Sequence, residues 1–387
     1  MLTFDSWTGI NNVLPAHRLG GSDLIGAQDV NIGLTGEITR RAGFTEVSTD
    51  CHKNLHQAAG YRLATQGSEL VALHPNGDRY VIHPSLGPER VWYCNLPDGR
   101  VTFANGLIQG ITDGFSGQDR SIPAPDSLGA PDMAFGDLDP GQYRYALTHV
   151  RADGAESPAL VSEPITITQG GLRLDGLPVR LGLGINIYLT QRDGEQPYLV
   201  GTTVGSSFEW AGKNSDLVLP CRTVGAQAIP VGTITAYWRG RVLVAQGGLL
   251  LASRDYAPHV SDWRDFKQFG GTITAIQPVD DGVYVGTTED LIWLGGPSWD
   301  ALTYTATRRG PVVLGSGVTA PGDRLKLGDG VGGGSAMVCI SGGEIVAGFN
   351  GGTISGLTTD RYKTTATEVC ATFREVDGIP QYIACSQ

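Results

Sequence analysis

Lysine, long apolar runs and strongly basic segments are scarce in this sequence, and each shortage argues against a class of protein. Only five of the 28 Lys and Arg residues are lysine, and 39 Asp and Glu residues bring the formal net charge to −11. The basic deficit is spread evenly, so no segment forms the basic block that neutralises phosphates in specific DNA binding. No run of about 18 apolar residues occurs, so we expect no membrane insertion.

The N-terminus argues against a secreted protein, and the spacing of the cysteines argues against a zinc-binding protein. The first 20 residues have neither a basic n-region nor an apolar h-region, so we expect no signal peptide and synthesis in the cytoplasm. No CxxC pair occurs, so we expect no zinc site. We predict that the six cysteines are buried free thiols: Cys51, Cys94, Cys221, Cys339, Cys370 and Cys385.

No set of side chains with catalytic spacing stands out. His52 and His56 have i,i+4 spacing, but no acidic residue completes a metal set, so we expect them in a solvent-facing loop. A glycosidase could use four carboxylates that more simply belong to turns: Asp280, Asp281, Glu289 and Asp290. We therefore expect a protein that is not an enzyme and that has no cofactor.

Glycine is the abundant residue, with 56 Gly alongside 21 Pro. Short alternating apolar runs lie between Gly, Asn-Gly and Asp-Gly turns, and helical periodicity is nearly missing, so the chain is predicted to be all-β. The stretch "GYRLATQGSELVALHPNGDRYVIHP" (Gly60–Pro84), for example, reads as three strands with turns at Gln66-Gly67 and Asn76-Gly77.

A degenerate repeat indicates a β-propeller. Three related phrases each hold a β-branched strand, a tight turn and a second apolar strand: "GRVLVAQGGLLLAS" (Gly240–Ser253), "DGVYVGTTEDLIWLGG" (Asp281–Gly296) and "AMVCISGGEIVAGFNGGTISGLT" (Ala336–Thr358). The first two begin 41 residues apart, a spacing typical of four-stranded blades. Chance similarity between hairpins is the alternative. We predict about six blades.

One region breaks this pattern. The loop "ESPALVSEP" and the hairpin "IYLTQRDGEQPYLV" resemble a fibronectin type III or immunoglobulin-like β-sandwich. The predicted organisation is an N-terminal arm and clasp hairpin (1–50), first blades (51–127), an inserted sandwich (128–229) and the remaining blades (230–387). The clasp would close the propeller by pairing Val30–Val47 with the late strand "GIPQYIACS".

Several phrases together resemble one family. They are "FDSWTGINNVLPAHRL", "DVNIGLTGEITRRAGFTEV", "GRVLVAQGGLLLASRDYAPHVSDW", "DGVYVGTTEDLIWLGG" and "TRRGPVVLGS". The chain is similar to the tail nozzle, or tail-hub stabilisation, proteins of short-tailed bacteriophages. That family has an aromatic arm, an Asn-x-x-x-x-Gly hairpin and an Arg-(Pro/Ala)-Gly-(Phe/Tyr) phrase. The candidate assembly residues are Trp7, Arg18, Asn31, Gly36, Arg40, Arg41, Gly43 and Phe44.

The resemblance implies a structural virion protein of the phage tail. Six copies would form a homohexameric ring below the portal and adaptor, retain the packaged genomic DNA and open for its ejection. Partners would be portal-side tail proteins and tail fibres or a needle, and the DNA would pass without sequence-specific binding. We expect Arg41 to make a bidentate contact with a carboxylate, within the chain or on a neighbouring copy.

The alternative belongs to another class: a carbohydrate-binding or glycan-hydrolysing propeller with an accessory sandwich. Tryptophans could stack on sugar faces, although buried propeller aromatics are the simpler interpretation of Trp92, Trp263, Trp293 and Trp299.

Overall fold

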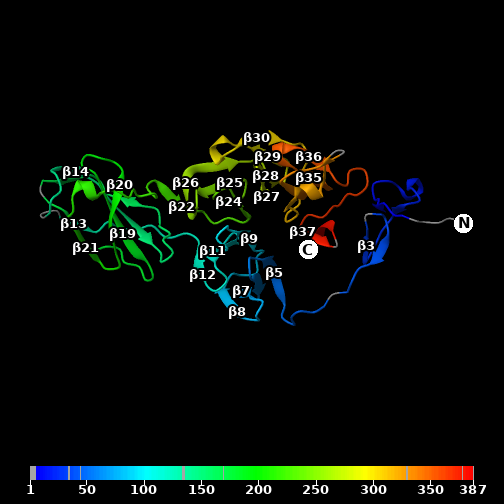
Figure 1. The fold of residues 1–387 in the computed structure, drawn as a ribbon, viewed down its shortest axis with the longest axis horizontal. Helices are drawn as coiled ribbons and strands as arrows, with labels where there is room; N and C mark the ends of the chain where they lie inside the picture. The colour runs from blue at the N-terminus through cyan, green and yellow to red at the C-terminus, as the bar shows by residue number, and fades with distance from the viewer. Residues whose placement is uncertain are drawn as a thin grey trace.

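The computed structural model describes residues 6–33, 35–43, 45–132, 136–168, 170–327, 330–376 and 378–386, and this chain is all-β (Figure 1). Its helices are single 3-10 turns: η1 (Ala16–Arg18), η2 (Asn214–Asp216), η3 (Trp299–Ala301), η4 (Gly322–Arg324) and η5 (Asn350–Gly352). None of these described helices is long and apolar enough to cross a membrane. The predicted all-β class is confirmed.

Two four-stranded antiparallel sheets follow one another in the first third of the chain. Sheet I contains β5 (His52–Gln57), β6 (Arg62–Gln66), β7 (Glu69–Leu73) and β8 (Arg79–His83). Sheet II contains β9 (Trp92–Asn95), β10 (Val101–Ala104), β11 (Gln109–Thr112) and β12 (Gly117–Asp119). In both sheets neighbouring strands pair in chain order, because each connection is a short turn that can only join antiparallel neighbours.

Three further sheets follow after residue 225. Sheet III contains β22 (Ala226–Ala228), β23 (Thr235–Trp238), β24 (Arg241–Gln246), β25 (Leu249–Arg254) and β26 (Ala257–Gln268). Sheet IV contains β27 (Ile273–Val279), β28 (Gly282–Thr287), β29 (Leu291–Gly295) and β30 (Thr303–Ala306). Sheet V contains β31 (Val318–Pro321), β34 (Ser335–Ser341), β35 (Glu344–Gly348) and β36 (Ile354–Gly356), with the small hairpin β32 (Lys326–Leu327) and β33 (Gly330–Val331) beside it. The C-terminal hairpin is β37 (Val369–Val376) and β38 (Ile379–Ser386).

Apolar clusters join each sheet to the next. Phe103 of sheet II shares a cluster with Leu70 of sheet I. Val244 of sheet III packs with Ile111 of sheet II. Three more clusters link sheets III and IV, sheets IV and V, and sheet V and the C-terminal hairpin. Central strands such as β28 are buried at every position, because both faces of a middle sheet are covered.

The segment between sheets II and III forms its own packed unit, at one end of the molecule in Figure 1. One sheet contains β13 (Ala130–Asp132), β18 (Leu172–Asp175) and β21 (Ser207–Trp210). The other contains β16 (Leu160–Val161), β15 (Tyr145–Val150), β19 (Gly184–Thr190) and β20 (Pro197–Thr203). A short pair, β14 (Gly141–Tyr143) and β17 (Ile165–Ile167), completes the unit. Leu174 of the first sheet and Leu147 of the second share one core, so the two sheets face each other.

The N-terminal arm contains β1 (Gly9–Ile10) parallel to β2 (Asp23–Leu24), and the hairpin of β3 (Val30–Ile32) and β4 (Ile38–Arg40). The predicted clasp is wrong in its pairing. Among the described residues β3 pairs with β4, and β37 pairs with β38, so no strand joins Val30–Val47 to the C-terminal strands. The solvent-facing loop expected at His52 and His56 is also wrong, because both lie in β5, where His56 stacks on Tyr93 with ring centroids 4.8 Å apart.

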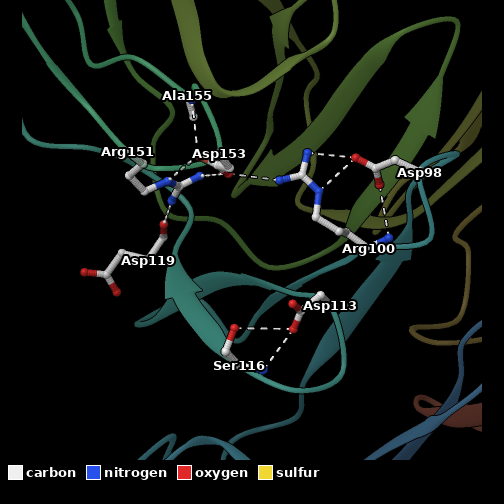
Figure 2. A network of polar contacts seen from close by, with 8 residues as sticks. All are labelled: Asp98, Arg100, Asp113, Ser116, Asp119, Arg151, Asp153 and Ala155. Carbon is white, nitrogen blue, oxygen red and sulfur yellow. Dashed lines mark hydrogen bonds and ion pairs between the residues drawn. The ribbon is translucent and has the colours of Figure 1, made fainter. Parts of the chain in front are cut away.

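A polar network joins sheet II to the inserted unit (Figure 2). Arg100 pairs with Asp98 of its own turn at 2.7 Å and with Asp153 of the insert at 3.1 Å. Arg151 of the insert donates to the Asp119 carbonyl oxygen at 2.7 Å. Burial raises the pKa of the Asp153 carboxyl, but hydrogen bonds from Arg151 and Ala155 and the charge of Arg100 outweigh it, and its pKa is lowered overall.

His259 of β26 lies at this junction and is only 9% exposed, so its protonation should make the stability of the folded chain depend on pH. Burial, with the charge of Arg151 second, lowers the pKa of His259 from 6.5 to about 4. Between these two pH values the His259 imidazole therefore stays neutral in the folded chain but takes up a proton in the unfolded chain. The stability of the folded state that is present above pH 6.5 is consequently lost as the pH falls toward about 4.

We expect the free energy of unfolding to fall by on the order of 2 kcal/mol over that window through His259. Urea denaturation at a series of pH values measures it. His259→Gln should flatten the slope, and the exposed His17→Gln controls for loss of a histidine. An unchanged slope in His259→Gln would contradict the assignment.

Candidate functional site

The N-terminal arm holds the predicted assembly residues, and Gly36 shows why its hairpin folds as it does. Gly36 has φ of +85°, and a Cβ there would lie 2.7 Å from the Trp7 nitrogen. The Trp7 N–H donates to the Gly36 carbonyl oxygen at 2.8 Å. Only glycine allows this approach without strain. The structure therefore brings Trp7 and Gly36 together.

Asn31 and Arg41 also meet. Arg41 N–H donates to the Asp29 carbonyl oxygen at 2.8 Å, and its Nε lies 3.4 Å from Asn31 Oδ1. This contact is to an amide in place of the bidentate carboxylate that we expected, and Arg41 makes no ion pair within the described residues. Beside it lies an open hollow of about 630 Å³ lined by Asp29, Arg40, Arg41, Ala42 and Gly43.

The remaining predicted residues are dispersed. Arg18 is exposed on η1, on a different part of the arm from the hairpin. Gly43 has open space around the position of a Cβ, so packing does not require glycine there. Phe44 lies outside the described residues.

Contacts that the sequence did not suggest attach the arm to the loop after β36. Asn12 Nδ2 donates to the Lys363 carbonyl oxygen at 2.7 Å, and the Lys363 N–H donates back to Asn12 Oδ1 at 2.8 Å. Arg361 donates to the Thr8 carbonyl oxygen at 2.8 Å and lies 3.7 Å from Asp23. The arm thus reaches the last sheet through loop contacts, while a long extended segment connects it to β5 (Figure 1).

The arm exposes an unusual share of apolar side chains. Ile25 is 74% exposed and Val47 is 88% exposed. Among the described residues of the arm, the exposed large apolar side chains are those of Val13, Leu14, Ile25, Ile38 and Val47. Exposed apolar side chains concentrated on one extended segment are typical of a surface that a partner covers.

A second feature is a cleft to which β9, β23 and β27 of three different sheets contribute. One part, of about 640 Å³, is lined by residues of β9, β23 and β27, including Tyr237, and by Asp280 just after β27. An adjoining part of about 320 Å³ adds His56 and Ala371, so β5 and β37 reach it as well. Three hydroxyls on these strands have no hydrogen-bond partner within the described residues: those of Tyr93, Thr235 and Thr274.

At one seam the start of the C-terminal hairpin meets the segment before sheet II and the connection between sheets IV and V. Arg90, just before β9, donates to Glu368 at 2.9 Å and stacks over Trp92. The Val369 N–H donates to the Leu314 carbonyl oxygen at 2.9 Å. At Gly315 a Cβ would lie 2.1 Å from the Val369 carbonyl oxygen, so the close approach at the seam requires glycine.

The acidic residues weighed for glycosidase chemistry hold loops in place. Asp280 accepts from the Ser335 hydroxyl at 2.7 Å and from Asn350 at 3.1 Å, and the hydrogen bonds from Ser335 lower its pKa. Asp290 accepts from the backbone N–H groups of Arg308 and Arg309 at 3.0 and 2.8 Å. No cluster of three metal-ligating side chains occurs among the described residues.

Comparisons with known proteins leave the family open. No family model matches the sequence, and no curated protein matches it. Among solved structures, BBS1N, solved in complex with ARL6DN, is 11% identical with a TM-score of 0.33 over 87% of this chain and 90% of that one.

Two further structures align with lower scores. PorZ of the type-IX secretion system of Porphyromonas gingivalis is 11% identical, with a TM-score of 0.22 over 90% of this chain and 52% of that one. An extracellular domain from B. thetaiotaomicron, BT4673, is 9% identical, with a TM-score of 0.25 over 87% of this chain and 58% of that one. At these scores the three likenesses carry no argument about function.

The arm's attachment generates a prediction. Asn12→Ala removes the reciprocal pair of hydrogen bonds with Lys363, and we expect roughly 1–2 kcal/mol less stability for the docked arm. Hydrogen exchange of residues 8–24 should then become faster, while the sheets keep their protection. Arg18→Ala, an exposed change on the same arm, is the control. Equal exchange in Asn12→Ala and the native chain would mean that other contacts hold the arm.

Proposed function

We propose that this chain is a structural virion protein of a bacteriophage tail, a nozzle or hub ring component that retains packaged DNA and allows its ejection. The observation that carries the proposal is the N-terminal arm, which presents exposed apolar side chains and an arginine-lined hollow. The motif residues of the resemblance, Asn31, Gly36, Arg41 and Gly43, lie around one hairpin on that arm. The protein would act in the virion tail as a homo-oligomeric ring after synthesis in the host cytoplasm.

The finer architecture belongs to the same proposal. Sheets I to V would be successive blades of a degenerate β-propeller, and the C-terminal hairpin would be an incomplete sixth blade. Supporting this, each sheet shares an apolar cluster with the next. The facing sheets between residues 130 and 210 would be an inserted immunoglobulin or fibronectin-like sandwich.

The ring contact would form through the arm hairpin. The hollow beside Arg40 and Arg41 fits a carboxylate, and a second copy of this acidic chain supplies many. Guanidinium groups bind carboxylates through paired hydrogen bonds, which fixes orientation as well as affinity. Covering Ile38 and Val47 in the same contact would add burial of apolar surface.

DNA would pass between copies and not through the cleft of one chain. The larger part of that cleft, about 640 Å³, has the size of a small-molecule pocket, far below the room that a duplex needs. A wall with a net charge of −11 per copy would repel the duplex, so gating would be steric.

Assembly provides the direct test. Purified full-length protein, alone and with portal–adaptor complexes, should form rings visible by electron microscopy and by light scattering. Arg40→Glu with Arg41→Glu should reduce assembly at least several-fold, because the hollow would then repel carboxylates. Arg62→Glu, an exposed change on β6, is the matched control. Persistent monomers that never bind tail components would contradict the proposal.

DNA binding provides a second test. We expect no detectable binding of duplex DNA at physiological salt, where charge repulsion acts over about 8–10 Å. A gel-shift titration at several salt concentrations measures it. Sub-micromolar affinity with a steep salt slope would show a basic track on the folded surface, for example around Arg308 and Arg309, and would overturn the steric account.

One observation favours the alternative, a glycan-binding protein. Trp263 on β26 is 63% exposed and stacks with Arg264, whereas Trp293 and Trp299 are buried. Exposed tryptophan faces suit sugar rings. A glycan array with the native chain and Trp263→Ala, together with a reducing-sugar assay, separates the two functions. Glycan binding that is lost in Trp263→Ala would favour the glycan-binding hypothesis.

A further inference from the structure

The C-terminal hairpin places two cysteines directly opposite each other. Cys370 of β37 is the register partner of Cys385 of β38, and both side chains are exposed with free thiols. The expectation that all six cysteines are buried is therefore wrong: Cys94, Cys221 and Cys339 are buried, and Cys51, Cys370 and Cys385 are exposed.

The hairpin's proline shows which kind of pair the cysteines form. Pro380 lies opposite Glu375 and has no N–H to donate, so this pair must be a non-hydrogen-bonded one. Pair types alternate along an antiparallel ladder, and the register runs without a bulge to Cys370 and Cys385. Counting five pairs along makes the cysteines a hydrogen-bonded pair, whose Cα atoms lie about 5.5 Å apart. Disulfides span Cα separations of about 4.4–6.8 Å.

Both thiols lie on the solvent face of the hairpin. Phe373 and Tyr382, on the alternate face, pack against sheet V, and the Tyr382 hydroxyl donates to the Ser316 carbonyl oxygen at 2.7 Å. Opposed side chains on the cysteine face do meet, since Arg374 Nε donates to Gln381 Oε1 at 3.0 Å. An oxidant can therefore reach the two thiols while the hairpin stays docked.

We propose that Cys370 and Cys385 form a reversible cross-strand disulfide, a redox modification site on the hairpin that completes the seam. With glutathione disulfide as oxidant, the thiolate of one cysteine attacks a glutathione sulfur and releases one glutathione. The second cysteine's thiolate then displaces the bound glutathione. One S–S bond forms within the chain and the S–S bond of glutathione disulfide is broken, and the two cysteine thiol protons end on the two glutathione molecules that are released.

The geometry predicts that this bond is easily reduced. Cβ atoms of a directly opposed pair are about 4.5–5.5 Å apart, whereas a relaxed disulfide holds them near 3.8 Å. Closing the bond must therefore twist the ladder locally, and strained, exposed disulfides are the labile ones. The bond would tie β38 to β37, whose first residues follow Glu368 at the seam with Arg90.

The experiment uses the full chain carrying Cys51→Ser, which removes the remaining exposed thiol. After incubation in glutathione buffers of graded oxidation, intact mass and a non-reducing peptide map are recorded. We expect loss of two hydrogens, a peptide joining Cys370 to Cys385, full reversal by dithiothreitol, and several-fold slower hydrogen exchange in β37 and β38.

A control variant with one thiol on the other face of β37, the face control, tests whether the disulfide depends on the two cysteines lying opposite each other. Cys370→Ser with Ala371→Cys moves the first thiol to the opposite face of β37 while keeping the number of thiols. It should give glutathione adducts without the internal link. Adducts alone in the Cys51→Ser chain, or equal cross-linking in the face control, would overturn the proposal.

Discussion

Burial of apolar sheet faces against neighbouring sheets is the constraint on which the rest of this structure depends. A four-stranded antiparallel sheet rich in Val, Ile and Leu on both faces cannot leave them in water, so the middle sheets of the series each lie between two others. Phe103, Val244 and Tyr284 each sit in a cluster that spans a boundary between consecutive sheets. The series then has to end somewhere. At its end the C-terminal hairpin offers one apolar face, with Phe373 and Tyr382, and leaves the other to solvent.

Polar contacts attach three parts of the chain to the packed sheets: the start of the C-terminal hairpin, the N-terminal arm and the inserted unit. The seam uses Arg90, Glu368 and the close backbone approach at Gly315. The arm is attached through amide and carbonyl groups around Asn12 and Lys363. The insert is joined through Arg100, Arg151 and their carboxylates. Exposed or half-exposed polar contacts contribute far less than core packing. We therefore expect these three contacts to add less to the stability of the chain than the cores between the sheets.

The proposed role in a tail ring draws on this division. A component of a ring needs a rigid body that keeps its shape and a segment that can engage a neighbour. The packed sheets supply the first, and the arm, with its exposed Ile25 and Val47, supplies the second. The thiol pair on the C-terminal hairpin adds a covalent way to stiffen the seam without disturbing the core behind it.

Period-two alternation and Gly-centred turns were enough to determine the all-β class, because both are local properties of the chain. The role of Gly36 as a turn residue could also be predicted from the sequence, because it stands between two short strand-like segments. Its contact with Trp7 could not be predicted. Long-range pairing was decided by the tertiary structure alone. Strand-like segments at Val30–Val47 and near the C-terminus could have paired with each other, yet each pairs locally, because a hairpin closes at a smaller loss of chain entropy than a contact across the whole chain. The opposition of Cys370 and Cys385 depends in turn on a register set by the turn between β37 and β38, and a slip of one residue would have put the two thiols on opposite faces.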